Sequence, residues 1–172
     1  MKFNKKGLTL LLKIKNMEKN QILHRVSGEG ASYWGPGDIY TFLITGAESG
    51  GQFFSMLAAV PPGGGPPPHI HYNETETFYV LEGEFTFTLV DKKVTAKAGD
   101  FLSVPPNTVH CFKNESDVFS RMILTFTPSG IEKFFEETLE RAYDITGVQP
   151  DNIDEVVAKY IEAAPRYGLK FI

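Results

Sequence analysis

The chain has 172 residues, 42% of them hydrophobic and 22% charged, so we expect one ordinary-sized domain with a substantial core. A single cysteine excludes an intrachain disulfide framework and a cysteine-rich zinc site, and no apolar run approaches the roughly 20 residues of a membrane helix. The net charge is -4, but residues 26–172 hold ten basic and twenty acidic side chains, and this negative body disfavours nucleic acid as a partner. We therefore expect a cytoplasmic protein that binds neither nucleic acid nor membrane.

Residues 1–20 form a basic N-terminal tail to which we assign no function. Lysines before the apolar residues 8–12 resemble the start of a signal peptide. However, Lys13 and Lys15 interrupt the apolar stretch, and no A-x-A-like cleavage site follows. Two interpretations stay open: a solvated tail, or a true start at Met17, in which case residues 1–16 are not native.

From residue 39 to residue 127 the chain reads as short strands separated by Gly and Pro. The expected strands, rich in β-branched and aromatic residues, are 40–45, 52–60, 77–81, 84–90 and 118–127. Glu82-Gly83 and residues 91–93 are predicted hairpin turns. Many short, closely spaced strands predict an antiparallel sandwich or barrel over residues 21–128.

Residues 129–172 predict a helical extension packed on the barrel. Ser129 and Glu132 form a capping-box pattern ahead of an apolar series with helical spacing. That series is Ile131, Phe134, Phe135, Thr138, Leu139 and Ala142. A second helix is expected after Pro150 and before Pro165, with one apolar side formed by Ile153, Val156, Val157, Tyr160, Ile161 and Ala164. The outside or the mouth of the barrel is the only large surface that can cover these faces.

The residues that carry chemistry lie in the segment 63–76 and near residue 110. His69 and His71 are two residues apart, so both imidazoles leave the same face of a strand and suit one metal ion. Glu76 shares a face of the next strand with Phe78, and His110 lies in a second Pro-flanked segment. An H-x-H pair arises by chance in roughly one such chain in ten. The alternative to a metal site is therefore two surface histidines on an edge strand.

Two longer patterns decide against that alternative. The first is G-x5-H-x-H-x4-E-x6-G, formed by Gly63, His69, His71, Glu76 and Gly83. The second is G-x5-P-x4-H-x3-N, formed by Gly99, Pro105, His110 and Asn114. Over about residues 38–127 the chain thus resembles the cupin superfamily through its two signature motifs. Asn107 stands where the second motif usually has Gly, and we expect a positive φ there, which Asn tolerates.

The resemblance implies an all-β fold, a cupin jelly-roll barrel, here with two C-terminal α-helices. By matching position it carries over His69, His71, Glu76 and His110 as ligands of one divalent transition metal. Three imidazoles and one carboxylate suit Fe, Mn, Ni, Co, Cu or Zn and are ill-suited to Ca or Mg. Four protein ligands on an octahedral ion leave two positions for water, substrate or O2.

Further candidates lie beside this set. Phe78 and Phe112 share strand parity with Glu76 and His110, so we expect both near the site, as substrate contacts or as ordinary core. His24 lies outside the expected strands and is predicted at the surface. Cys111 should point away from His110 and is predicted as a buried packing residue.

A metal cupin does not define its reaction, because the fold hosts dioxygenases, isomerases, decarboxylases and binding proteins. Residues 37–43, 45–46, 50–51 and 61–68 resemble single-domain cupins of the quercetin 2,3-dioxygenase-like group. That resemblance implies a dioxygenase that uses O2 to cleave a flavonol or a related enolisable aromatic, with Glu76 as the catalytic base. We also expect a homodimer.

Two other classes of function stay open. One is a metal-dependent isomerase or lyase of a small sugar or oxo-acid, for which Arg121 and Lys113 are the obvious cations in the barrel strands. The other is a non-catalytic cupin that binds a small molecule.

Overall fold

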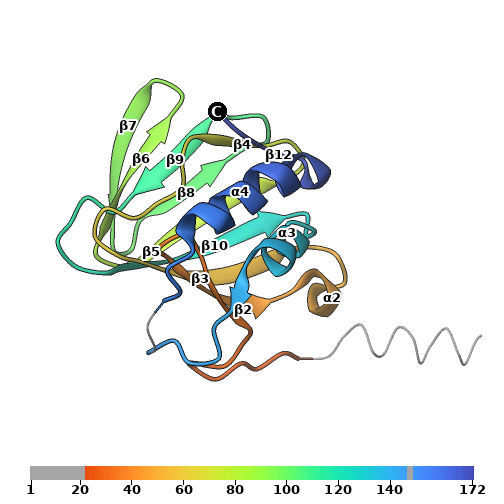
Figure 1. Ribbon diagram of the computed structural model, residues 1–172. Coiled ribbons are helices and arrows are strands. Elements are labelled where there is room, and N and C mark those ends of the chain that lie inside the picture. Colours follow the sequence, from red (N-terminus) through yellow and green to blue (C-terminus); the bar gives the residue numbers. More distant parts are fainter. Residues whose placement is uncertain (1–21, 147–148) are drawn as a thin grey trace, which may run out of the picture.

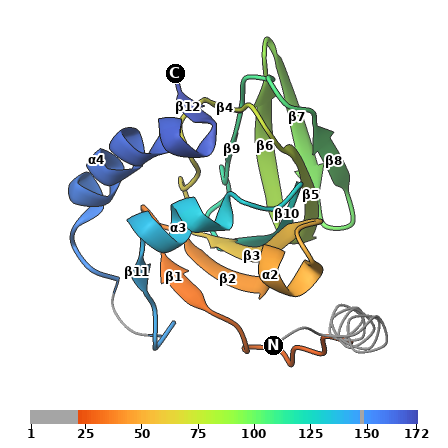
Figure 2. The ribbon, with the colours of Figure 1, turned by 90° about the vertical axis from the view of Figure 1, so that its right-hand side faces the viewer.

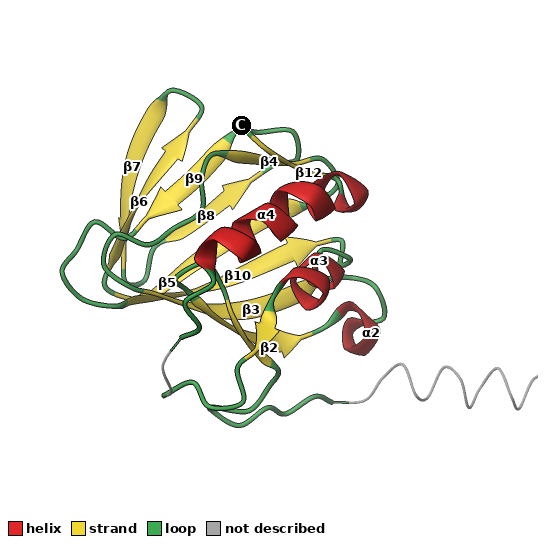
Figure 3. Cartoon of the chain, in the orientation of Figure 1, coloured by secondary structure: helices red, strands yellow, loops and turns green. Residues whose placement is uncertain are grey.

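The computed structural model describes residues 22–146 and 149–172, and most of its elements are strands (Figure 1 and Figure 3). The strands are β1 (Ser32–Trp34), β2 (Ile39–Ile44), β3 (Phe54–Val60), β4 (His69–His71), β5 (Thr75–Glu82), β6 (Glu84–Leu89), β7 (Lys92–Lys97), β8 (Phe101–Val104), β9 (His110–Lys113), β10 (Ser120–Thr127), β11 (Glu140–Arg141) and β12 (Leu169–Phe171). The helices are α2 (Gly46–Ser49), α3 (Glu132–Thr138) and α4 (Ile153–Ala163), and α4 continues into a 3-10 turn, Ala164–Tyr167. The predicted tail, residues 1–20, and the alternative start at Met17 lie outside the described residues.

These strands form two antiparallel sheets, which confirms the expected all-β jelly-roll. One sheet has the order β11-β1-β2-β3-β10-β5-β8, and the other has the order β12-β4-β9-β6-β7. Strands β11 and β12 come from the C-terminal segment, so this segment extends both sheets as well as supplying helices. Figure 2 shows α3 and α4 on the side of the barrel away from the β6–β7 hairpin.

The core between the sheets is aromatic. Phe42, Phe54, Phe126 and Phe135 form one group, with ring centroids 4.6–6.5 Å apart between contacting pairs. Phe78, Phe85, Phe87 and Phe112 form a second group, with centroids 4.9–6.4 Å apart. Buried aromatic rings supply much apolar area per residue and pack best in tilted or edge-on pairs, so these two groups make a rigid base for a site between them.

The predicted turn at Glu82-Gly83 is wrong as a hairpin. Strand β5 ends at Glu82 in the seven-stranded sheet, whereas β6 begins at Glu84 in the five-stranded sheet. Gly83 has φ +74° and lies so close to Ser120 that a Cβ would meet its Oγ at 2.1 Å, so this corner requires glycine. The real hairpin joins β6 to β7 with Leu89 opposite Lys92, so its turn is residues 90–91 rather than 91–93.

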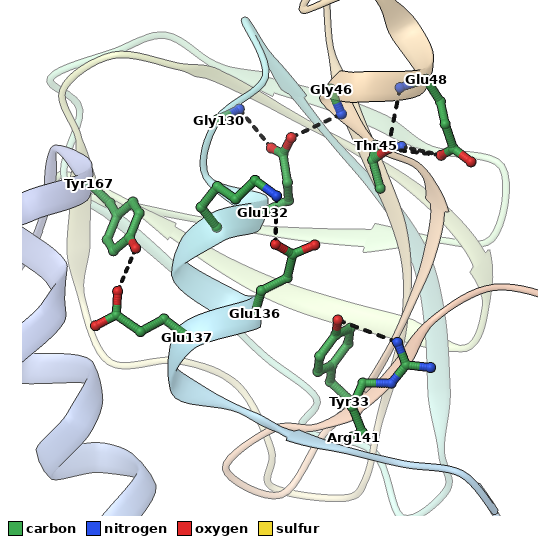
Figure 4. Close-up of polar contacts among 11 residues, drawn as sticks. Tyr33, Thr45, Gly46, Glu48, Gly130, Glu132, Glu136, Glu137, Arg141 and Tyr167 are labelled. Atoms are coloured by element: carbon green, nitrogen blue, oxygen red, sulfur yellow. Dashed lines mark hydrogen bonds and ion pairs between the residues drawn. The ribbon is translucent and has the colours of Figure 1, made fainter.

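The first predicted helix is shorter than its apolar series. All six apolar residues of that series are buried, but α3 ends at Thr138 and the chain continues as β11, which pairs with β1. The predicted capping box is also wrong: Ile131 is the N-cap and makes no side-chain cap. The carboxylate of Glu132 accepts instead from the backbone N–H groups of Gly46 at 2.9 Å and Gly130 at 2.7 Å, which ties α3 to α2 (Figure 4). Tertiary contacts thus replaced the local cap.

The second predicted helix forms, but its apolar side is only partly covered. Val156, on α4, and Ala164, in the turn that follows, are buried, whereas Ile153, Val157 and Ile161 are 46%, 39% and 61% exposed. Pro165 does not stop the helical path at once, because the 3-10 turn carries it to Gly168, which is left-handed. Among the described residues, no helix has the length and apolar character that would let it cross a membrane.

Candidate metal centre

The two sheets bring the four predicted ligands together. His69 and His71 lie on β4, whose alternation buries both rings and leaves Ile70 partly exposed. His69 is in register with His110 on β9, and Glu76 reaches the same point from β5 in the other sheet. One donor atom from each of these four buried side chains lies within 4.8 Å of all the others. This group could hold one metal ion.

Backbone anchors of the two motifs fix this arrangement. The amide of Asn114, fully buried, donates to the carbonyl oxygens of Val60 at 2.9 Å and Val118 at 2.7 Å. Its backbone exchanges hydrogen bonds with Gly63 and Gly64, so the glycine-rich loop before β4 is fastened beside β9. Asn114 and the glycines of the two patterns therefore hold the histidine strands in place rather than contact a ligand side chain.

Asn107 joins the two motifs directly. It has φ +67°, which confirms the expected left-handed turn. Its backbone N–H donates to the carbonyl oxygen of His71 at 2.8 Å, so this turn also anchors the end of β4.

Hydrogen bonds to backbone carbonyls orient two of the imidazoles. His69 Nδ1 lies 2.9 Å from the carbonyl oxygen of Pro67, and His110 Nδ1 lies 3.0 Å from that of Thr108. A carbonyl oxygen only accepts, so each Nδ1 carries a proton and each Nε2 faces the site. On His110 the Nε2 also carries a proton, because it donates to the Glu76 carboxylate, and it would release that proton to bind a metal. His71 Nδ1 lies 3.7 Å from a carboxylate oxygen of Glu74, which is itself buried. The sequence analysis did not single out Glu74, although it lies within the first motif.

The charges of the site are coupled through Glu76. Its Oε2 lies 2.8 Å from His110 Nε2 and 3.4 Å from His71 Nε2. Burial by itself would raise the pKa of Glu76, but the hydrogen bond with His110 and the nearby histidine charges hold it below its ordinary value. Burial likewise opposes charge on His110, yet the bond to Glu76 raises the pKa of that imidazole. Burial lowers the pKa of His69 to about 4, so that ring is neutral at pH 7.

These properties fit a divalent transition metal. Three nitrogen donors and one ionised carboxylate oxygen converge, and Nε2 of His110 and of His71 both face the same oxygen of Glu76. Buried histidines crowded onto one carboxylate repel one another when protonated, and a cation at their centre satisfies all four groups at once. Calcium and magnesium, which prefer oxygen ligands, fit this donor set poorly.

A small cavity of about 50 Å³ is lined by His69, His71 and Glu76, and aromatic rings form much of the rest of its wall. Phe112 lines this cavity, whereas Phe78 is fully buried behind the site with its ring 6.2 Å from that of His110. Phe134 and Phe135 of α3 and Tyr160 of α4 also line it. The C-terminal segment therefore closes the mouth of the barrel over the site.

Two minor expectations had different outcomes. His24 is exposed, as predicted, and stands apart from the ligand group. Cys111 is only half-buried, so its prediction as a buried packing residue is wrong. It lies on the face of β9 opposite His110 and Phe112, where the alternating burial pattern of the strand leaves side chains less covered.

A second, larger cavity of about 270 Å³ was not predicted. It lies between α4, the loops before β2 and β4, and the end of β12. Its polar side chains are Asp38, Tyr40 and Tyr160. These residues come from distant parts of the chain, and no local pattern in the sequence marks them as a group.

Comparison with known proteins supports the same fold. The cupin domain family matches residues 56–126. Quercetin 2,3-dioxygenase of Bacillus subtilis is 33% identical over 118 residues, which make up 69% of this chain but 34% of that enzyme, so the chain spans about a third of its length. KdgF from a Halomonas species covers 66% of this chain and 99% of its own with a TM-score of 0.58 at 18% identity. An RmlC-like cupin from Shewanella frigidimarina covers 66% and 97%, with a TM-score of 0.54 at 23% identity. The chain belongs to the cupin superfamily.

Proposed function

We propose that this member of the cupin superfamily is a metal-dependent dioxygenase that cleaves a flavonol, such as quercetin, or a related enolisable aromatic. The observation that carries the proposal is the buried group of three imidazoles and one carboxylate at the end of an aromatic-walled cavity. The similarity to the Bacillus subtilis quercetin 2,3-dioxygenase supports the same reaction class.

His69, His71, Glu76 and His110 would hold the metal. A divalent transition metal supplies Lewis acidity toward a substrate hydroxyl and redox chemistry toward O2. The protein supplies the geometry: backbone carbonyls lock the rings of His69 and His110, and the buried Glu74 lies beside the ring of His71. These contacts limit the rotation of the rings and keep their donor atoms turned toward the site.

Glu76 is the proton acceptor in this proposal. Its lowered pKa keeps the carboxylate ionised at neutral pH, so it is ready to take the hydroxyl proton of an enolisable substrate. Its position on β5 puts it at the inner end of the small cavity, beside the three histidines. Phe112 forms part of the wall against which a flat ring packs, and burial there contributes about 25 cal/mol per Å² of apolar area.

The residues that line the two cavities disfavour a phosphorylated substrate. Neither described cavity has a lysine or arginine among its lining residues. Arg121 pairs with Glu82 at 3.1 Å in an exposed position, and Lys113 is exposed. A phosphate requires convergent cations, so a neutral aromatic substrate fits these walls better.

The test is oxygen uptake with quercetin by the full chain. Protein purified without chelators is analysed for its metals, then stripped and reconstituted separately with Fe, Mn, Ni, Co and Cu. We expect at least one metal form to consume oxygen in proportion to the quercetin lost. If no form consumes oxygen and a small sugar or oxo-acid is turned over anaerobically, the isomerase or lyase class replaces this proposal.

Two accompanying proposals concern assembly and location. We propose that the protein forms a homodimer and that it lies in the cytoplasm. The single free cysteine supports the second proposal, because proteins of a reducing compartment rarely carry disulfides. Light scattering on the purified chain tests the dimer, for which a mass of one chain is the contrary result.

A further inference from the structure

The larger cavity adjoins the smaller one at the candidate metal centre. The 270 Å³ cavity and the 50 Å³ cavity share four lining residues: Tyr40, Pro66, Tyr160 and Phe171. The outer walls of the larger cavity are apolar, with Pro36 and Pro67 from loops and Val157 and Ile161 from the exposed side of α4. The incompletely covered face of α4 thus has a role as a wall of this cavity.

Two buried polar atoms of this wall have no hydrogen-bond partner. Asp38 is 2% exposed; its Oδ2 accepts from the Tyr40 hydroxyl at 2.8 Å, while its Oδ1 has no partner. The hydroxyl of Tyr160 is also buried without a partner. An unsatisfied buried polar group costs about 1–3 kcal/mol, so two of them in one cavity wall indicate that a ligand completes them.

We propose that this cavity binds a hydroxylated aromatic ring of the substrate, the end remote from the metal centre, through Asp38 and Tyr160. The inference rests on the proposed function, because it assumes that the other end of the same molecule lies among the histidines. The ligand class is a neutral polyphenol that carries at least one hydroxyl on its remote ring.

Size and chemistry both support this assignment. A volume of 50 Å³ is of the order of one or two water molecules, so only the edge of an aromatic substrate enters the inner cavity. The rest must occupy the larger cavity, whose apolar walls suit a flat ring. A phenolic hydroxyl both donates and accepts, so it can donate to Oδ1 of an ionised Asp38 or accept from Oδ1 of a protonated one, and it can accept from the Tyr160 hydroxyl.

The charge state of the wall favours a neutral ligand over an amine. Burial raises the pKa of Asp38 to about 7, although the hydrogen bond from Tyr40 partly opposes the shift. Much of this side chain is therefore protonated at neutral pH, and it offers an uncharged partner rather than a fixed anion. With no lysine or arginine in the lining, an anionic ring is disfavoured as well.

Binding to the full chain as purified tests the inference without turnover. The ligands are quercetin and 3-hydroxyflavone, which share the enolisable edge but differ in the remaining hydroxyls; affinities are measured anaerobically by quenching of protein fluorescence. We expect the wild type to prefer quercetin by roughly three- to tenfold, the weight of one or two hydrogen bonds. Tyr160→Phe, which removes one hydroxyl and keeps the ring, should reduce that preference to near unity.

The matched control is Tyr167→Phe, from the turn that follows the same helix. The Tyr167 hydroxyl donates to Glu137 at 2.5 Å on the surface (Figure 4), outside both cavities, so this variant should keep the wild-type preference. A Tyr160→Phe variant with undiminished preference overturns the inference, even if oxygen uptake proceeds. If no metal form consumes oxygen yet the preference depends on Tyr160, the reaction class fails and the subsite stands.

Discussion

Two cavities of this protein differ in how they are built: the inner cavity of about 50 Å³ at the candidate metal centre, and the outer cavity of about 270 Å³ beside α4. The inner cavity takes its chemistry from residues in two short motifs, where Glu76 Oε2 lies within 3.4 Å of Nε2 of both His71 and His110, and Nδ1 of His71 has no hydrogen-bond partner. The outer cavity takes its polar groups from β2, the loop before it and α4, and two of these groups have no partner. The difference teaches that local patterns assemble the candidate metal centre, whereas the packing of remote segments shapes the cavity beside it.

The largest effect is expected when the carboxylate of the inner cavity is neutralised. Glu76→Gln keeps the shape of the side chain and one oxygen, so we expect much of the metal to remain. The variant cannot accept the substrate proton, and turnover should fall by roughly 10²-fold or more. Oxygen uptake with quercetin, normalised to bound metal, measures the loss.

Glu82→Gln is the control for that substitution, because it makes the same change on the same strand. Glu82 is exposed and pairs with Arg121, far from both cavities. It should keep wild-type turnover. Equal turnover in Glu76→Gln and Glu82→Gln would remove Glu76 from its catalytic role.

Loss of one imidazole tests the inner cavity as a metal centre. His69→Ala, His71→Ala and His110→Ala each leave an incomplete donor set, so metal affinity should fall by at least about tenfold in each. Elemental analysis after dialysis at limiting metal measures occupancy. His24→Ala, an exposed histidine, should retain the metal, and full occupancy in all three ligand variants would contradict the site.

The sequence predicted that these four side chains lie together, and it could do so for a physical reason. Strand alternation places His69 and His71 on one face, and the same rule aligns Glu76 with Phe78, so spacing alone determines direction. The positive φ at Asn107 was also predictable from a local feature, because Asn stands where the motif usually has Gly. Asp38 and Tyr160 carry no such signal, since they are 122 positions apart and meet only once α4 is docked.

The errors in the fold arose where long-range contacts replaced local preference. The helical period of residues 131–142 predicted burial correctly, but the last turn became β11 because β1 offered an unpaired edge. Glu82-Gly83 has the composition of a hairpin turn, yet the strands on either side belong to different sheets. Sheet membership depends on partners remote in sequence, which turn chemistry does not encode.

The state of Asp38 in the outer cavity can be tested through the pH dependence of the free energy of unfolding. The pKa of Asp38 is raised to about 7, above the unfolded value of about 3.9, so the folded protein holds this proton more tightly. Its contribution to stability is complete below pH 4 and is lost as the pH rises through 7. Between pH 5 and pH 7.5 the free energy of unfolding of the wild type should fall relative to that of Asp38→Asn by roughly 2–3 kcal/mol.

Urea unfolding of both proteins at each pH measures this difference, and the histidines, which both proteins share, cancel from it. Asp117→Asn is the control, because Asp117 is exposed and should leave the pH profile of the wild type unchanged. Parallel profiles for the wild type and Asp38→Asn would mean that the buried carboxyl is not protonated preferentially in the folded state.

The smallest expected effect compares two tyrosines of the same cavity. Tyr40→Phe removes a hydroxyl that donates to Asp38, so it should destabilise the protein by about 1 kcal/mol, or a melting shift of roughly 2–4 °C. Tyr160→Phe removes a buried hydroxyl without a partner, so its melting temperature should match or slightly exceed that of the wild type. Calorimetry of the ligand-free chain separates the two cases. A loss in Tyr160→Phe as large as that in Tyr40→Phe would mean that this hydroxyl is already satisfied within the protein, and the outer cavity would then lack the free group that recognises a phenol.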